Sequence, residues 1–112
     1  HQVRSAYEGI SRDEALHTVV AYEPIWAIGT GRASTASAAN KVSEKYVRST
    51  LERIYGHEVS QLIRIQYGGS INRGNIAEFI VQTDIDGVLI GGSSLSSDEF
   101  TAILCCVSTT YK

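Results

Sequence analysis

The sequence has no excess of positive charge and no long apolar run. Ten Lys and Arg against twelve Asp and Glu leave a formal net charge of −2, which provides no basic surface for nucleic acid or anionic membranes. No apolar run approaches the roughly 18 residues of a membrane span, and the start, His1 to Arg4, is unlike a signal peptide. We therefore expect a cytoplasmic protein that binds neither nucleic acid nor membrane.

Cysteine is nearly absent as well. The two cysteines, Cys105 and Cys106, are adjacent within a helical pattern, where they are too close for an ordinary disulfide with each other. No metal-ligating partners lie beside them, and the sequence contains no metal-ligand cluster. We interpret them as packing residues or free thiols, and we expect no cofactor.

Three short apolar, β-branched runs, at residues 17–22, 63–67 and 88–90, are each followed by a loop and a helical pattern. The first run has no clean polar alternation, which is typical of a strand covered on both faces. The repeated order of strand, loop and helix predicts an α/β fold with parallel strands and right-handed crossovers. The 112 residues, 43% of them hydrophobic, match one domain of ~100–150 residues.

The helical patterns have recognisable ends. Residues 1–9 are typical of the end of a helix that stops at Gly9. Ser11 followed by Glu14 resembles a capping box. A long helix is predicted from Thr35 as N-cap to Gly56, with a solvated polar face of Lys41, Glu44, Lys45, Arg48 and Glu52. A further helix at 73–82 would bury Ile76, Ala77, Phe79 and Ile80, and a last one would begin near Ser96.

Glu23 is the first candidate functional residue. Pro24 has no N–H for a strand ladder, so it ends the first run and leaves Glu23 at a strand's carboxyl end. In parallel α/β folds ligands bind at this rim. An apolar loop, residues 25–28, would desolvate the carboxylate and favour its use as a general base. The alternative is a solvated or paired surface charge.

Two glycine pairs are expected on the same rim. Gly68 and Gly69 follow the second run, and Gly91 and Gly92 follow the third. Glycine allows main-chain N–H groups to approach a ligand closely. In barrels the last two loops form an anion site beside a short helix N-terminus. The alternative is that these glycines only make tight turns.

The segments AYEPIWAIGTG, YGGSIN and DGVLIGGSSL occur in this order. Together they resemble the last three strand and loop units of the triosephosphate isomerase family, from the end of helix 5 through strand 6 to helix 8. The resemblance runs from about Val3 to the C-terminus. It implies that residues 1–112 are the C-terminal part of a (β/α)8 TIM barrel, three parallel β/α units of a fold that takes roughly 250 residues.

The resemblance also implies a function and its residues. The family interconverts glyceraldehyde 3-phosphate and dihydroxyacetone phosphate by proton transfer, in glycolysis and gluconeogenesis, and is a homodimer. Glu23 would be the catalytic base. The phosphate of this small phosphorylated triose would be bound by main-chain N–H groups of Gly29, Ser70, Gly91 and Gly92.

A closing loop is implied by the same resemblance. Trp26 would belong to its N-terminal hinge, although it could also be only a core aromatic. Tyr67 and Ser70 would latch the C-terminal hinge, around Gly31 to Ser34. Arg32-Ala33-Ser34 stands where Lys-Thr-Ala or a close variant is common, and Ala36 replaces a frequent proline, which concerns the stiffness of the hinge.

The family also needs a lysine after its first strand and a histidine after its fourth, which stabilise the enediolate oxygens. Neither strand is expected in this sequence. We therefore expect the 112-residue chain alone to be inactive, and to self-associate through open strand edges or to need the missing N-terminal part. Two alternatives stay open: a non-catalytic chain that binds phosphate weakly or self-associates, and another phosphate-binding TIM barrel.

Overall fold

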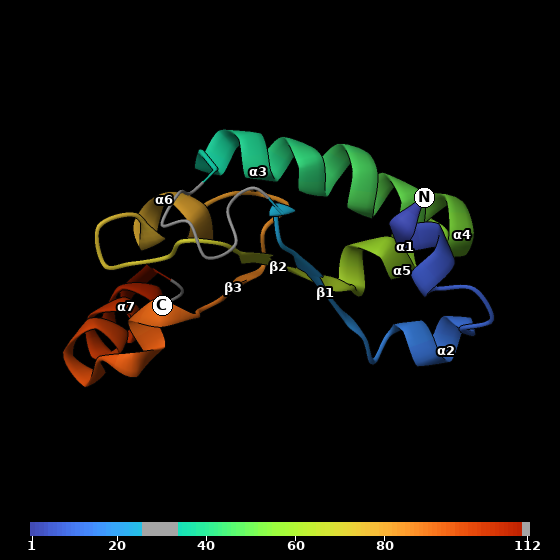
Figure 1. The fold of residues 1–112 in the computed structure, drawn as a ribbon. Helices are drawn as coiled ribbons and strands as arrows, with labels where there is room; N and C mark the ends of the chain where they lie inside the picture. The colour runs from blue at the N-terminus through green and yellow to red at the C-terminus, as the bar shows by residue number, and fades with distance from the viewer. Residues whose placement is uncertain (26–33, 111–112) are drawn as a thin grey trace.

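The computed structural model describes residues 1–25 and 34–110. The described chain contains three strands and several helices, and Figure 1 colours them from blue at the N-terminus to red at the C-terminus. The elements are α1 (Gln2–Ala6), α2 (Arg12–Ala15), β1 (Val19–Tyr22), α3 (Ala36–Val42), the π-helix η2 (Ser43–Arg48), α4 (Ser49–Tyr55), α5 (His57–Leu62), β2 (Arg64–Gly68), α6 (Ile76–Ile80), β3 (Gly87–Leu89), the 3-10 helix η3 (Gly92–Leu95) and α7 (Ser97–Thr110).

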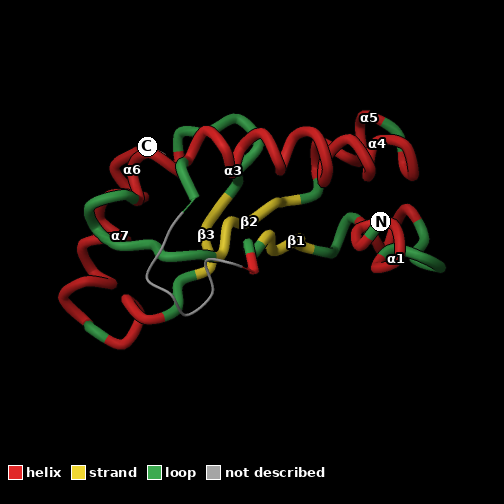
Figure 2. Tube along the Cα trace, turned by 45° about the horizontal axis from the view of Figure 1, so that its top comes forward, coloured by secondary structure: helices red, strands yellow, loops and turns green. Residues whose placement is uncertain are grey.

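The three strands form one parallel sheet in the order β1-β2-β3. Tyr22 of β1 lies opposite Tyr67 of β2, and Gly68 of β2 lies opposite Leu89 of β3. Figure 2 shows the strands side by side, with α3 and η2 running along one side of them. The predicted α/β class and the predicted parallel strands are confirmed.

The sheet has one covered and one open face in the part of the chain that the structure describes. Along β1 exposed and half-buried residues alternate, and Val19 is 50% exposed. On β2 Ile65 and Tyr67 are fully buried, whereas Leu89 of β3 is 45% exposed. The prediction that the first strand is covered on both faces is therefore wrong, because helices pack against only one face of this sheet.

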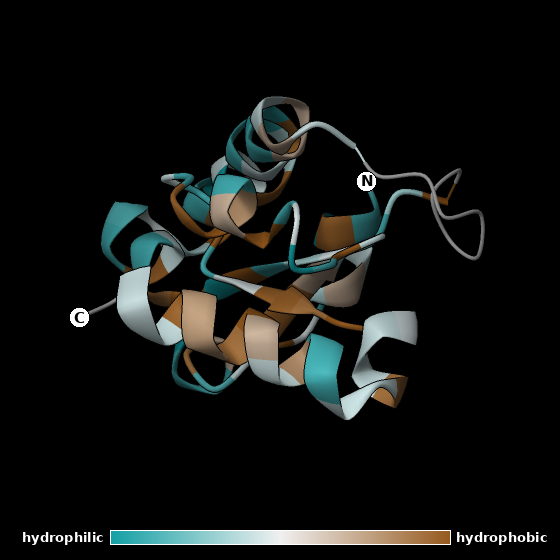
Figure 3. Cartoon of the chain, turned by 90° about the vertical axis from the view of Figure 1, so that its left-hand side faces the viewer, coloured by the Kyte–Doolittle hydropathy of each residue, from teal (hydrophilic) through white to brown (hydrophobic). Residues whose placement is uncertain are grey.

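Two hydrophobic clusters on the covered face hold the fold together, and β2 contributes to both. One cluster joins Ile63 and Ile65 to Leu51 of α4 and Val59 of α5. The other joins Tyr67 to α3, α6 and α7, and the rings of Tyr67 and Phe79 stack with centroids 4.4 Å apart. Figure 3 shows hydrophobic residues gathered on the central strands. β2 is thus the element that connects the two halves of the core.

The predicted caps are confirmed. The Ser11 hydroxyl accepts a hydrogen bond from the Glu14 main-chain N–H at 3.1 Å, and the Glu14 carboxylate accepts one from the Ser11 N–H at 2.9 Å. This capping box begins helix α2. The Thr35 hydroxyl accepts from the Ala38 N–H at 3.1 Å, and Gly56 ends α4 with a φ of +93°, which glycine adopts readily.

Some predicted boundaries are wrong. The first strand begins at Val19 and not at residue 17, and α6 is only Ile76–Ile80, with Ala77 exposed and not buried. Helix α5 was not predicted, because its sequence directly follows Gly56 and has few apolar residues.

Cys105 is exposed and Cys106 is half-buried, and both are free thiols. Among the described residues, no helix is long and apolar enough to cross a membrane.

Arg48 is the largest departure from the predicted pattern. It was predicted on a solvated face, but it is 4% exposed. Its guanidinium donates to the carboxylates of Asp84 and Asp86, each at 3.0 Å. It also donates to the carbonyl oxygens of Ser60 and Ile63, at 2.7 and 2.8 Å.

The π-helix η2 explains the departure. A π-helical turn contains an extra residue, so the residues that follow are rotated relative to a uniform α-helix. Arg48, the last residue of η2, is turned inward, and Tyr46 is 66% exposed although a uniform helical pattern placed it on the apolar face. Asp86 also accepts the Ile65 N–H at 2.9 Å. The hydrogen bonds and ion pairs around Arg48 therefore join η2 to β2 and to the segment that leads into β3.

We predict that Arg48→Met destabilises the fold by roughly 3 kcal/mol, because it leaves two partly buried carboxylates and two carbonyl groups without their donor. Urea unfolding would measure the change. Arg53→Met, at an exposed position of α4, is the matched control and should shift the midpoint little. An Arg48→Met variant as stable as this control would contradict the assigned role.

Candidate functional site

The carboxyl ends of the three strands bring several predicted site residues to one rim. Glu23 directly follows β1, Ser70 comes two residues after β2, and Gly91 comes two residues after β3. Because the strands are parallel and Tyr22 pairs with Tyr67, these positions meet at the same edge of the sheet. Trp26, Gly29 and Gly31, the other predicted site residues, lie outside the described residues.

Glu23 lies against the main chain of β2. A side chain at Gly68 would place its Cβ 2.6 Å from Glu23 Cγ and 3.2 Å from the carboxylate carbon. Gly68 therefore provides the space in which the Glu23 side chain lies, a role that the sequence did not predict. The strand register reveals this role: because Tyr22 pairs with Tyr67, the residues that follow them, Glu23 and Gly68, are neighbours.

The expected desolvation of Glu23 is not provided by the described part of the loop. Glu23 is exposed, and Ile25 is itself 81% exposed. Trp26 and Ile28, the other apolar residues expected to cover the carboxylate, lie outside the described residues. In the described part of the chain the Glu23 carboxylate takes part in no ion pair, so it is available to a ligand at the rim.

The Tyr67 side chain is held from several sides. It is fully buried, and a side chain on Gly69 would collide with its ring, with the Cβ 2.8 Å from Tyr67 Cε2. Its hydroxyl accepts a hydrogen bond from the main-chain N–H of Ser34 at 3.0 Å. Burial, and to a lesser extent Tyr67, raise the pKa of the neighbouring Tyr22. Tyr67 thus links β2 to the residue that precedes the Thr35 cap.

The loop after β2 is stiffened by two asparagines. The Asn72 side chain accepts from the N–H groups of Gly74 and Asn75, and the Asn75 side chain accepts from the Asn72 N–H at 2.9 Å. Asn75 also donates to the Ser70 carbonyl at 2.7 Å. Within the described part of the chain the Ser70 main-chain N–H donates no hydrogen bond.

Gly91 and Gly92 differ from Gly68 and Gly69 in their surroundings. Both are exposed, and an added Cβ at either would meet no described residue within 4 Å. The turn that follows is closed by Ser94, whose N–H donates to the Gly91 carbonyl at 2.9 Å. Packing among the described residues does not require glycine at 91 and 92, whereas it does at 68 and 69. No described residue fills the space beside the second glycine pair.

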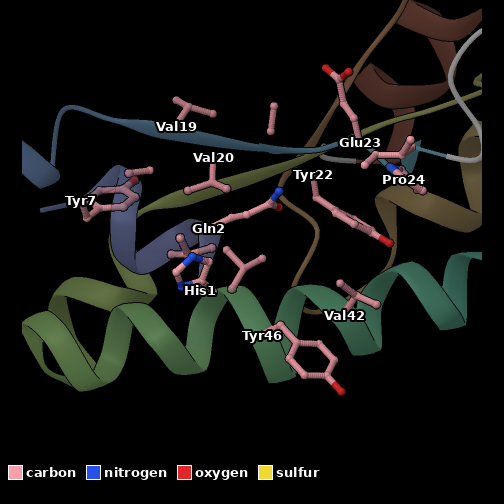
Figure 4. Close-up of a pocket in the computed structure, with 15 residues that line it drawn as sticks. His1, Gln2, Tyr7, Val19, Val20, Tyr22, Glu23, Pro24, Val42 and Tyr46 are labelled. Atoms are coloured by element: carbon pink, nitrogen blue, oxygen red, sulfur yellow. The ribbon is translucent and has the colours of Figure 1, made fainter.

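A groove of about 860 Å³ runs along β1. Figure 4 shows Val20 and Tyr22 directed toward the helix that carries Val42 and Tyr46, with His1 and Gln2 in between, while the Glu23 carboxylate points the other way. β1 pairs only with β2 in the described sheet, so its outer edge is open here. An extended, mostly apolar segment would suit this groove, because it could pair with the strand edge.

No group of three or more His, Cys, Asp or Glu side chains among the described residues is arranged to hold a metal ion.

The family model of triosephosphate isomerase matches residues 1–107. The chain belongs to the triosephosphate isomerase family. It is 48% identical over 104 residues to the triosephosphate isomerase of Thermoanaerobacter pseudethanolicus, covering 93% of this chain and 42% of the relative. It is also 48% identical over 103 residues to that of Thermoanaerobacter sp. strain X514, covering 92% of this chain and 41% of the relative. The chain thus spans about two fifths of the length of these curated relatives.

Membership of the triosephosphate isomerase family explains the open face of the sheet. The three consecutive parallel β/α units correspond to part of a TIM barrel, as predicted. In such a barrel the helices form the outer ring, and the other face of each strand lines the interior. The exposed Val19 and Leu89 lie on the face that would be interior in a closed barrel.

We predict that Gly68→Ala displaces the Glu23 side chain, because the new Cβ would overlap Glu23 Cγ at 2.6 Å. The carbon chemical shift of the Glu23 carboxyl in NMR would report the displacement. Gly92→Ala is the control, since its Cβ has free space, and it should leave that signal in place. An unchanged Glu23 signal in Gly68→Ala would show that the side chain does not lie against β2.

Proposed function

We propose that this chain is the C-terminal part of a triosephosphate isomerase that interconverts glyceraldehyde 3-phosphate and dihydroxyacetone phosphate. The observation that carries the proposal is the position of Glu23 on the same rim as Ser70, Gly91 and Gly92, in a chain 48% identical to triosephosphate isomerases. A carboxylate and an anion site on one rim suit proton transfer on a small phosphorylated substrate.

Glu23 would act as the general base. Its carboxylate is exposed, takes part in no ion pair among the described residues, and is backed by Gly68. A base must reach the substrate proton to within hydrogen-bond distance, and a carboxylate free at the rim satisfies this requirement. Glu23 would take the proton from one substrate carbon and return it to the neighbouring carbon.

The substrate phosphate would be bound by main-chain N–H groups of Gly29, Ser70, Gly91 and Gly92. Within the described residues the N–H groups of Ser70 and Gly91 donate no hydrogen bond, and the space next to Gly91 and Gly92 is open. Neutral amides can bind an anion without cationic side chains, which suits a chain with a net charge of −2.

The loop after Glu23 would close over the substrate, with Trp26 and Gly31 at its hinges and Tyr67 as a latch. The hydrogen bond of 3.0 Å from the Ser34 N–H to the Tyr67 hydroxyl supports the latch. Ser70 forms no hydrogen bond to Ser34 in the described part of the chain. We therefore assign the latch to Tyr67 and assign Ser70 to the phosphate.

Residues 1–112 would form a partial TIM-barrel domain within a longer cytoplasmic enzyme, a homodimer like its family. The groove along β1 would take the preceding barrel strand. The lysine and histidine of the family would come from the remaining strands. Alone, the 112-residue chain would keep the β1 edge and the apolar face of Val19 and Leu89 uncovered. These surfaces favour self-association, which is the second candidate behaviour of the isolated chain.

We predict that the chain, fused to the N-terminal part of the Thermoanaerobacter pseudethanolicus enzyme, isomerises glyceraldehyde 3-phosphate. In this fusion Glu23→Gln should lower kcat by at least about 100-fold, because the proton acceptor is lost, while affinity for inorganic phosphate stays close to that of the parent. A coupled assay and equilibrium dialysis would measure the two quantities.

The 112-residue chain by itself is the control. It should show no turnover and should self-associate in light scattering. A Glu23→Gln fusion that keeps a tenth of the rate would exclude Glu23 as the base. Turnover by a monomeric 112-residue chain would exclude the partial-barrel proposal.

We also predict that Gly92→Val weakens the binding of inorganic phosphate and of substrate alike, because the side chain would occupy the open space that the anion needs. Equilibrium dialysis with labelled phosphate would measure the loss. Thr101→Val, at an exposed position of α7, is the control and should bind phosphate like the parent. Undiminished binding by Gly92→Val would place the anion site elsewhere.

A further inference from the structure

We propose that Ser93 and the Arg73–Glu99 pair are positioning residues for phosphate binding. They would hold the loop after β2 and the loop after β3 at one separation, so that N–H groups of Ser70 and Gly91 converge on a single anion. The inference deepens the proposed function and rests on it.

Ser93 makes the first of two hydrogen-bonded ties between the loops. Its hydroxyl donates to the main-chain carbonyl of Ile71 at 2.7 Å. Ile71 directly follows Ser70 and is 4% exposed, and Ser93 directly follows Gly92. The hydrogen bond therefore joins the two loops one residue after Ser70 on one side and two residues after Gly91 on the other.

Arg73 and Glu99 make the second tie. One Glu99 oxygen accepts the main-chain N–H of Arg73 at 2.9 Å, and the other accepts the Arg73 Nε–H at 2.7 Å. The main-chain N–H of Arg73, followed by its side chain, lowers the pKa of Glu99, because both hydrogen bonds favour the ionised carboxylate. Exposed ion pairs contribute little to stability in general, but here one donor belongs to the backbone of the loop, so the pair restrains the loop itself.

The two ties connect segments that are each internally ordered. The loop after β2 is stiffened by the reciprocal Asn72 and Asn75 hydrogen bonds. Glu99 lies in the first turn of α7, where its N–H donates to the Ser96 hydroxyl at 3.3 Å. Linking two stiff segments sets the separation between their N–H groups. Hydrogen-bond strength falls steeply outside the narrow range of favourable distances and angles, so this separation matters for anion binding.

The ties lie outside the hydrophobic clusters. The neighbouring cluster includes Tyr67, Ile71, Phe79 and Ile103. The Ile71 side chain belongs to this cluster, but the Ser93 hydroxyl binds only the Ile71 main-chain carbonyl, and neither that hydroxyl nor the Glu99 carboxylate is part of the cluster. Removing these groups should therefore change phosphate binding more than stability. A loss of phosphate binding without a matching loss of stability would distinguish a positioning role from a merely structural one.

The test is equilibrium dialysis of the 112-residue chain against labelled inorganic phosphate, beside urea unfolding of the same variants. Ser93→Ala and Glu99→Gln should each raise the phosphate Kd roughly three- to tenfold, on the scale of one hydrogen bond. The double variant should raise it further, with urea midpoints near that of the parent. Ser93→Thr keeps the hydroxyl and should restore binding. Ser108→Ala, exposed on α7, is the matched control.

The outcomes distinguish this inference from the proposed function. If Gly92→Val abolishes phosphate binding while the double variant stays within twofold of the parent, the positioning role is wrong and the phosphate site stands. If binding falls only in proportion to a lowered urea midpoint, the ties are structural and the inference is overturned. If neither the parent nor Gly92→Val binds phosphate measurably, both the site and the inference fail.

Discussion

The parallel pairing of β2 with both of its neighbours is the constraint on which the rest of the structure depends. It places the ends of three strands at one edge, so that Glu23, Ser70 and Gly91, which lie 21 or more positions apart in the sequence, follow strands that end together. Among the described strands, β2 alone has residues fully buried in both hydrophobic clusters. A shift of one residue in the pairing of Tyr22 with Tyr67 would turn side chains to the opposite face and would separate Glu23 from Gly68.

The glycines of the rim have two different physical roles. Gly68 and Gly69 have no side chain because Glu23 and Tyr67 occupy that space, so these glycines serve contacts within the protein. Gly91 and Gly92 border space that no described residue fills, so packing among the described residues leaves their main-chain groups uncovered. The sequence presents two similar Gly-Gly pairs, and only the surroundings of each pair distinguish a packing requirement from a candidate binding surface.

The open surfaces of the sheet follow from the same architecture. In a TIM barrel each strand has a neighbour on both sides, and the interior is filled by side chains from all strands. Three strands leave an unpaired edge on β1 and exposed apolar residues such as Val19 and Leu89. The partial coverage of β1 and the groove beside it therefore have one explanation: the described sheet corresponds to only part of the closed sheet of a TIM barrel.

The sequence by itself determined the fold class, the alternation of the three strands with helices, the Ser11 and Thr35 caps, and the family. These follow from local chemistry: the β-branched runs, the Ser11 and Glu14 capping box, the Thr35 cap, and glycines or Pro24 at the ends of elements. Motifs of several residues identified the family because their order along the chain is visible without a structure. Even so, strand and helix boundaries shifted by a few residues, since packing and not propensity decides them.

Only the tertiary structure decided which side chains meet. Arg48 looked solvated in a uniform helical pattern, but the π-helix and the distant Asp84 and Asp86 bury its charge. Gly68 became a partner of Glu23 only through strand register. Ser93 and Ile71 are joined across two loops. In each case the interaction links residues more than 20 positions apart, and local sequence patterns carry no information about such distant contacts.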